Sequence, residues 1–151
     1  MKLLKNLFYL FFPLFIGIIV GTIISGNINY IELNKPILSP PSILFPIVWT
    51  ILYLLMGISY FIFKNSSNKD DNLISYVYYI QLFINAFWSI VFFIFNWYLF
   101  SILWIILLDI FVILLIRLFS KNNKISAYLN IPYLIWILFA TYLTLGIYIL
   151  N

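Results

Sequence analysis

Long uninterrupted blocks of apolar residues constrain this chain more than any other feature of its sequence. Each block runs for about 20 residues, which is the length that a helix needs to cross about 30 Å of hydrocarbon. Because 66% of the 151 residues are hydrophobic and only 8% are charged, the chain lacks the polar surface that a water-soluble domain needs. The blocks do not show the short alternating pattern of a membrane barrel. The sequence therefore predicts an all-α integral membrane bundle of five transmembrane helices in a single domain.

The predicted helices follow the apolar blocks in order. We expect them at residues 7–25, 43–63, 73–95, 98–119 and 127–150. A secretory signal is the alternative for the first block, but the block is long for one and ends without a small-residue cleavage site, which favours a transmembrane helix. Only Asn96 and Trp97 separate the third and fourth helices, so these two helices are predicted to be antiparallel neighbours.

The basic residues predict how the bundle is oriented. An odd number of spans puts the two termini on opposite sides, and only Lys35 lies on the side away from the N-terminus. The N-terminal side carries Lys2, Lys5, Lys64, Lys69, Arg117, Lys121 and Lys124. Because positively charged loops stay in the cytoplasm, we expect a cytoplasmic N-terminus and a C-terminus on the opposite side. The basic residues form no continuous patch, so membrane lipid rather than nucleic acid is the expected partner.

The amino-acid inventory excludes several kinds of chemistry. The chain contains no cysteine and no histidine, which rules out disulfides and zinc–thiolate sites and removes the commonest metal ligand and general base. We therefore expect no metal site and no required cofactor. Gly17 and Gly21 form a Gly-x-x-x-Gly pair that permits close helix approach, either within the bundle or in a dimer.

A long proline-rich loop, residues 27–42, runs directly into an aromatic helix face. Loops of this length are often functional. Its prolines include Pro36, Pro40 and Pro41, and the helix that follows carries a stripe formed by Trp49, Tyr53, Met56, Gly57 and Tyr60. Helical spacing puts this stripe on one side. The pattern predicts a stiff lid joined to an aromatic wall.

Two further helices carry polar and aromatic residues on one face. In the third helix this face contains Tyr78, Gln81, Asn85, Trp88 and Phe92, and in the fifth it contains Tyr133, Trp136, Ala140 and Thr144. Amide side chains are costly in hydrocarbon unless they are hydrogen-bonded. Both amides could join helices or contact a ligand, and the sequence leaves these alternatives open.

Asp109 is the one acidic residue well inside a predicted span. Its burial costs at least about 3 kcal/mol on insertion scales, so it must be paired, protonated or solvated. A single carboxyl group is too little for a proton relay, and we predict a structural hydrogen-bonding role.

These segments together resemble the TspO/MBR family, also called the translocator protein or tryptophan-rich sensory protein family. The resemblance extends from about Lys35 to the C-terminus. It is carried by Lys35-Pro36, Ser39-Pro40-Pro41, Phe45-Pro46, Trp49, Leu52-Tyr53, Met56-Gly57, Gln81-Leu82, Asn85, Trp88, Phe92-Phe93, Asp109, Pro132-Tyr133-Leu134, Trp136 and Phe139-Ala140-Thr141. The resemblance implies a five-helix bundle, usually a homodimer, with a pocket under the loop that takes porphyrins, or sterols in eukaryotic members.

Together with the helix faces, the resemblance gives a set of expected ligand-binding residues. These are Trp49, Tyr53, Gln81, Asn85, Trp88, Phe92, Trp136 and Ala140. We expect a receptor or carrier for a porphyrin, and protoporphyrin rather than tightly ligated haem, because histidine and cysteine ligands are missing. The alternatives are a light-dependent porphyrin-degrading enzyme, in which Trp49 and Trp136 would be the catalytic candidates, and a small-molecule transporter.

The chain departs from the family pattern at two places. Leu38 stands where the family usually has a tryptophan two residues after the Lys-Pro pair, which removes one aromatic ring from the lid. The sterol-recognition pattern of the fifth helix needs a tyrosine followed by a basic residue, but Leu145 and Ile149 occupy these positions. Sterol binding through that motif, which is weak even when intact, is therefore not expected.

Overall fold

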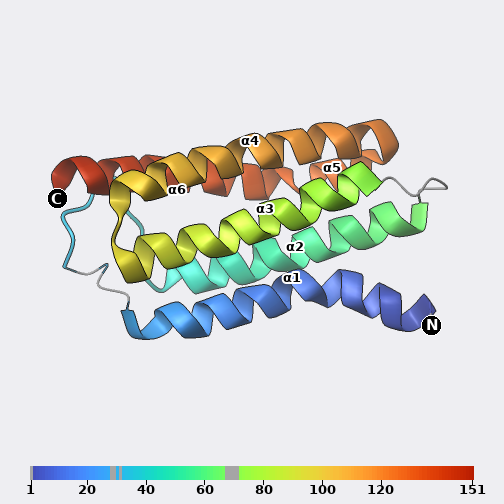
Figure 1. The fold of residues 1–151 in the computed structure, drawn as a ribbon, viewed down its shortest axis with the longest axis horizontal. Coiled ribbons are helices and arrows are strands. Elements are labelled where there is room, and N and C mark those ends of the chain that lie inside the picture. The colour runs from blue at the N-terminus through green and yellow to red at the C-terminus, as the bar shows by residue number, and fades with distance from the viewer. Residues whose placement is uncertain (1, 28–29, 31, 67–71) are drawn as a thin grey trace.

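The computed structural model describes residues 2–27, 30, 32–66 and 72–151, and every regular element in these segments is a helix (Figure 1). The elements are α1 (Lys2–Ile24), η1 (Ser25–Asn27), α2 (Leu44–Ser66), α3 (Asn72–Ile90), η2 (Val91–Phe95), α4 (Tyr98–Asn122), α5 (Lys124–Tyr128) and α6 (Ile131–Leu150). They make five helical segments in the described ranges that are long and apolar enough to cross a membrane. The predicted all-α membrane class is confirmed. Lys69 and part of the 27–42 loop lie outside the described residues.

The fifth span contains a break that separates α5 from α6. A turn at Leu129 and Asn130 divides the two helices, and Pro132 is the second residue of α6. Pro132 has no N–H to donate to the carbonyl of Tyr128, and its ring would collide with that carbonyl in a continuous helix. The proline therefore ends α5 and starts α6.

The break is closed by a buried polar cluster that ties α5 to α2. The Ser59 and Ser126 hydroxyls each donate to the other residue's backbone carbonyl, at 2.8 and 2.9 Å. The Asn130 amide donates to the Ser59 hydroxyl at 2.6 Å and to the Ser126 carbonyl at 2.9 Å. Such bonds hold helices together inside a membrane, where backbone groups freed from a helix find no water.

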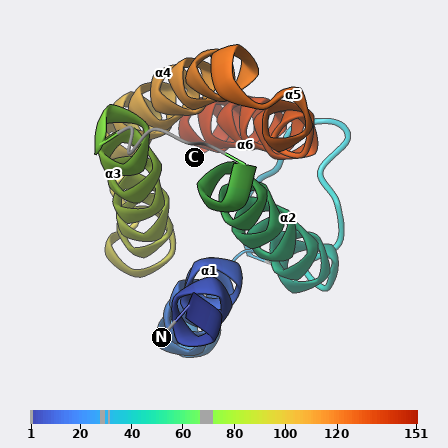
Figure 2. The same cartoon turned by 90° about the vertical axis from the view of Figure 1, so that its right-hand side faces the viewer.

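Viewed along the bundle axis, α1 lies at one side of the bundle, next to α2 and on the side opposite α4 (Figure 2). In the most apolar stretch of α1, only 11% of the residues are buried inside the bundle. In the span that α3 and η2 form, 61% are buried. α1 packs on α2 and, to a lesser extent, on α3. α1 is therefore the least enclosed of the five spans.

Glycines set how closely α1 approaches α2. A Cβ atom at Gly57 would overlap the backbone carbonyl oxygen of Leu10, and one at Gly17 would overlap the Tyr53 ring. A Cβ atom at Gly21, one turn further along α1, would have no neighbouring atom within 4 Å. Gly17 therefore serves packing within the chain, which is one of the two alternatives that its spacing allowed.

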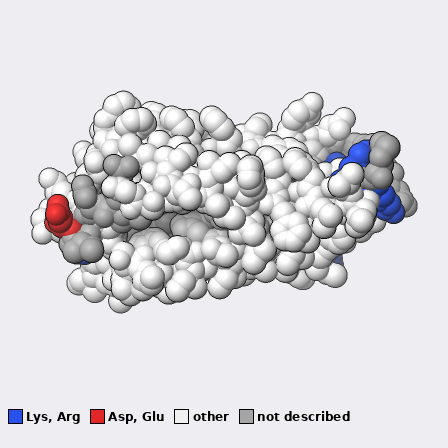
Figure 3. All heavy atoms as spheres, turned by 90° about the horizontal axis from the view of Figure 1, so that it is seen from below, with Lys and Arg blue, Asp and Glu red and all other residues white. Residues whose placement is uncertain are grey.

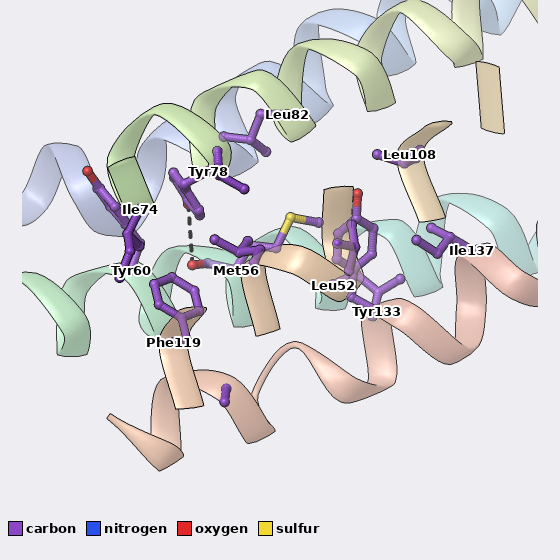
Figure 4. Packing of buried hydrophobic residues seen from close by; sticks show 14 of the residues in the cluster. Leu52, Met56, Tyr60, Ile74, Tyr78, Leu82, Leu108, Phe119, Tyr133 and Ile137 are labelled. Carbon is purple, nitrogen blue, oxygen red and sulfur yellow. Dashed lines mark hydrogen bonds between the residues drawn. The ribbon is translucent and has the colours of Figure 1, made fainter. Parts of the chain in front are cut away.

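The densest part of the core lies in the half of the bundle nearest the N-terminus. The Tyr60 and Tyr78 rings stack at 4.0 Å between α2 and α3, and Phe63 meets Phe119 of α4 at 5.2 Å. Figure 4 shows the Tyr78 hydroxyl donating to the Met56 carbonyl, at 3.3 Å. Aromatic side chains from α2, α3 and α4 thus meet in this half of the bundle.

Replacing Gly57 by alanine should destabilise the protein by about 1–3 kcal/mol, because the Leu10 carbonyl belongs to a helix backbone that cannot move aside freely. Unfolding in mixed micelles with increasing sodium dodecyl sulfate measures this loss. Gly21→Ala is the matched control and should leave stability unchanged or slightly raised. Equal stability of the two variants would show that α1 does not approach α2 at Gly57.

Candidate ligand-binding site

A cavity of about 390 Å³ lies between α1, α2 and the end of the α3 span. Figure 3 shows the surface hollowed on the α1 face, toward the end with the acidic side chain. Trp49 and Tyr53, two of the predicted ligand-binding residues, line the cavity from α2. The opposite wall is α1, where Gly17 lies against the Tyr53 ring and Gly21 faces open space.

The cavity is apolar with a few hydroxyl groups. Its hydroxyl-bearing lining residues, apart from the tyrosines, are Thr22, Ser25, Ser42, Thr50 and Ser89. The Thr22, Ser25, Thr50 and Ser89 hydroxyls already donate to backbone carbonyls of their own or adjoining turns. A hydroxyl oxygen that donates one bond can still accept another. The cavity therefore suits an amphipathic molecule with a large apolar surface and few polar groups.

A π-helical turn at the end of the third span brings two adjacent phenylalanines to the site. Over Val91–Phe95 the helix widens, and such turns are frequent at functional sites. Phe92 is buried and lies 5.5 Å from the Trp88 ring, while Phe93 packs edge-on against Phe92 at 4.9 Å. Regular helical spacing predicts only Phe92 on this face, so the turn adds Phe93.

Beside the large cavity lies a second space that is almost filled. Its volume is about 10 Å³, which is close to the least that holds one water molecule. Trp88, Phe92 and Ala140, all predicted ligand-binding residues, line this second space and not the large cavity. Of the other predicted residues, Trp49 and Tyr53 line the large cavity, whereas Gln81, Asn85 and Trp136 line neither space.

The Trp136 ring packs against Phe45, which lines both spaces. Their rings lie 5.9 Å apart, and Phe45 in turn contacts Tyr30 at 5.1 Å. The indole nitrogens of Trp88 and Trp136 are buried and find no hydrogen-bond acceptor in the described part of the chain. A buried N–H without a partner is rare in native proteins and calls for an explanation.

The predicted amides Gln81 and Asn85 join helices to each other. The Asn85 amide donates to the Tyr133 hydroxyl at 2.7 Å, and that hydroxyl donates to the Gln81 oxygen at 2.9 Å. The Tyr53 hydroxyl donates to the Asn85 oxygen at 3.2 Å. This series of hydrogen bonds links α2, α3 and α6 next to the cavity. Tyr53 takes part in the series and also lines the cavity.

Asp109 lies at the contact between α4 and α6. Its Oδ2 atom accepts a 2.9 Å hydrogen bond from the Thr141 hydroxyl, while Oδ1 is buried and has no partner in the described residues. Asp109 lines neither cavity. This arrangement agrees with a hydrogen-bonding role between helices.

The three prolines of the predicted lid lie at different places in the structure and make different contacts. Pro36 packs against Gly146 of α6, where a Cβ atom would overlap its ring. The carbonyl of Pro41 accepts from the backbone N–H of Leu44 at 3.0 Å where α2 begins, and Pro40 is half-buried just before it. Leu38 is 78% exposed in a left-handed conformation with φ of 74°. Leu38 thus points away from the site.

Sequence patterns did not indicate several residues of the site. Tyr30 comes from the loop, Phe93 depends on the π turn, and Phe45 precedes the predicted stripe. The α1 wall was also not predicted, because the α1 residues that line the cavity include no aromatic residue and form no polar stripe. Only the Gly17–Gly21 spacing marked this face of α1.

Asn85→Ala should lower the free energy of unfolding by about 1–2 kcal/mol, because the variant leaves the Tyr53 hydroxyl without its acceptor and removes a donor from Tyr133. Ser101→Ala is the control, because the Ser101 hydroxyl is also buried but bonds only to the Trp97 carbonyl one turn earlier. Denaturation in mixed micelles compares the two. Equal small losses in both variants would contradict a role for Asn85 in joining helices.

Comparison with known proteins places the chain in a family. The sequence profile of the TspO/MBR family matches residues 9–150. The tryptophan-rich protein TspO of Archaeoglobus fulgidus is 41% identical over 122 residues, which are 81% of this chain and 79% of that protein. The protein of the same name from Chlorobaculum tepidum is 37% identical over 124 residues, covering 81% and 78% of the two chains.

A third relative carries a different name. Protein CrtK of Rhodobacter capsulatus is 29% identical over 133 residues, which are 87% of this chain and 83% of that protein. The profile includes most of α1, so the cavity wall that α1 forms is part of the family domain. The chain is therefore a member of the TspO/MBR family and an integral multi-pass membrane protein.

Proposed function

We propose that this protein is a membrane receptor or carrier that binds a flat amphipathic molecule, with a porphyrin as the leading candidate class. Membership of the TspO/MBR family supports a sensory or binding role, and a relative from Cereibacter sphaeroides, 30% identical, is named a tryptophan-rich sensory protein. The cavity has one side of aromatic rings, which can stack on a flat ligand. Its volume of about 390 Å³ lies in the range of small-molecule sites.

The observation that carries the proposal is the pair of buried indole N–H groups without acceptors. Trp88 of α3 lines the filled space beside the large cavity, and Trp136 of α6 lies behind Phe45. Each has its indole nitrogen buried with no partner among the described residues. An unpaired buried donor costs about 1–3 kcal/mol. A ligand with oxygen atoms on its edge, such as carboxylates or carbonyls, would supply the missing acceptors and recover this cost.

Trp136→Phe and Trp88→Phe test this because phenylalanine keeps an aromatic ring and removes only the indole N–H donor. Each variant should weaken protoporphyrin binding about 10-fold, the equivalent of one hydrogen bond. The porphyrin's own absorbance reports the binding, so the lost tryptophan does not disturb the signal. Trp97→Phe is the control, because Trp97 is 60% exposed at the turn between α3 and α4.

Two results would contradict the proposal. Wild-type affinity in both Trp88→Phe and Trp136→Phe would show that these donors do not meet the ligand. Failure of the wild-type protein to bind protoporphyrin saturably, while it remains folded, would exclude porphyrins as the ligand class.

We also infer the orientation of the bundle from its charges. The two termini lie at opposite ends of the bundle (Figure 1), and Figure 3 shows a cluster of basic side chains at one end and an acidic one at the other. The described basic residues other than Lys35 lie near the start of α1 and around the ends of α2 and α4 and the start of α5. The positive-inside rule then puts this end in the cytoplasm.

Cysteine labelling tests the orientation without background, because the chain contains no cysteine. Ile37→Cys, at a position that is 83% exposed, should react with a membrane-impermeant maleimide in intact cells. Ser120→Cys, at the exposed end of α4, should react only after the membrane is permeabilised. The reverse pattern would show that the bundle is inverted.

A further inference from the structure

Three aromatic rings form a wall between the two spaces of the site. Tyr30, Phe45 and Phe93 line both the cavity of about 390 Å³ and the filled space of about 10 Å³. Trp88 and Ala140 line only the filled space. A ligand that stays in the large cavity therefore lies on the other side of this wall from the Trp88 ring.

Tyr30 is the member of this wall that does not belong to a helix. It comes from the loop between η1 and α2, yet only 4% of it is exposed. Its ring is buried in a cluster with Trp88, Phe92, Ala140 and Ile147, from the α3 span and α6. Because the backbones of Phe45 and Phe93 belong to helices, Tyr30 is the member of the wall whose displacement leaves the helices in place.

The backbone on the C-terminal side of Tyr30 is held in place. The Lys35 ammonium donates to the Tyr30 carbonyl at 3.0 Å and lies 4.8 Å from the centre of its ring. Asn34 and Asn151 exchange two hydrogen bonds, from the Asn34 N–H at 3.0 Å and from the Asn151 amide at 2.9 Å. The loop at Asn34 is therefore anchored to the end of α6, and the Tyr30 ring is the member of the wall that no helix carries.

Further contacts secure the same stretch of loop to α6. The Tyr142 hydroxyl donates to the Ile37 carbonyl at 2.5 Å, and Pro36 packs against Gly146. Gly146 and Tyr142 lie about one and a half and two and a half turns before Asn151, at the end of α6. The loop is thus attached along the C-terminal part of α6, and the Tyr30 ring enters the bundle beside that attachment.

We propose that the Tyr30 ring occupies part of the ligand site, so that a small planar molecule binds in the large cavity directly while a macrocycle must displace this ring to reach Trp88. The inference rests on the proposed function and adds a determinant of ligand size. The Tyr30 ring already occupies the place between the α3 span and α6 that one ring of a large ligand would take. If the state with the Tyr30 ring displaced is populated only in part, the apparent affinity for the macrocycle is reduced in proportion to that fraction.

Binding of two probes to matched variants tests the inference. Tyr30→Ala should raise protoporphyrin affinity about 10-fold or more, through faster association, because the closed state no longer exists. The affinity for isoquinoline, a two-ring probe, should not rise, because isoquinoline fits the large cavity without displacing the ring. Tyr30→Trp should slow porphyrin association. Trp97→Phe, at the exposed turn between α3 and α4, is the control that should bind both probes as the wild type does.

A second measurement tests the wall without any ligand. Ala140→Cys puts the only thiol of the chain into the filled space, where the native side chain is 3% exposed. N-ethylmaleimide should label this thiol about 10-fold faster or more when Tyr30→Ala is added, because the reagent then enters from the large cavity. Ile149→Cys, at a position that is 75% exposed, is the control and should be labelled equally fast in both backgrounds.

The outcomes separate this inference from the proposed function. Saturable porphyrin binding that is equal in wild type and Tyr30→Ala would overturn the size determinant and leave the proposed function intact. Weaker binding of both probes in Tyr30→Ala would overturn it as well, because Tyr30 would then stabilise the site. If no variant binds porphyrin, the proposed function fails, and unchanged labelling of Ala140→Cys would overturn the wall independently.

Discussion

The arrangement of the site depends most on the hydrogen bonds of the Tyr133 hydroxyl group. This hydroxyl accepts from Asn85 and donates to Gln81, and Asn85 accepts in turn from Tyr53. Inside hydrocarbon none of these groups can turn to water, so each must find its partner on a neighbouring helix. Three helices, α2, α3 and α6, are thereby held at one depth and one spacing, and the cavity lies directly above the bonds.

The two halves of the bundle differ in how they are filled. Toward the N-terminus, stacked rings such as Tyr60 and Tyr78 pack the interior closely. Toward the other end, the small residues Gly17 and Gly21 and the loop residue Tyr30 replace bulky helical side chains. Closely packed interiors resist deformation, so the first half provides a rigid base.

Much of the site could be predicted from residue type and spacing. The α2 stripe does face inward, since Tyr53, Met56, Gly57 and Tyr60 are buried and Trp49 lines the cavity. The polar face of α3 is likewise buried at Gln81 and Asn85. Spacing alone could not decide what these amides contact, because a hydrogen bond to another helix and one to a ligand place the same demand on the sequence.

The local sequence also did not reveal features that depend on long-range contacts. The π turn at Val91–Phe95 moves Phe93 onto the site although the surrounding pattern is that of a regular helix. Tyr30 is buried because the loop that follows it is anchored to α6, more than 100 positions further along the chain. No periodicity within the loop encodes that attachment.

The sequence by itself determined the class of the protein, the number of its spans and the inward faces of its middle helices. These properties follow from local rules: a helix needs about 20 apolar residues to cross the membrane, and side chains three or four positions apart share a face. Only the tertiary structure decided which predicted residues line the large cavity, which line the filled space and which line neither, that α1 supplies a wall, and that Tyr30, Phe45 and Phe93 lie between the two spaces. Those facts depend on which side chain meets which across helices, and close packing of particular shapes determines that rather than the pattern of any one segment.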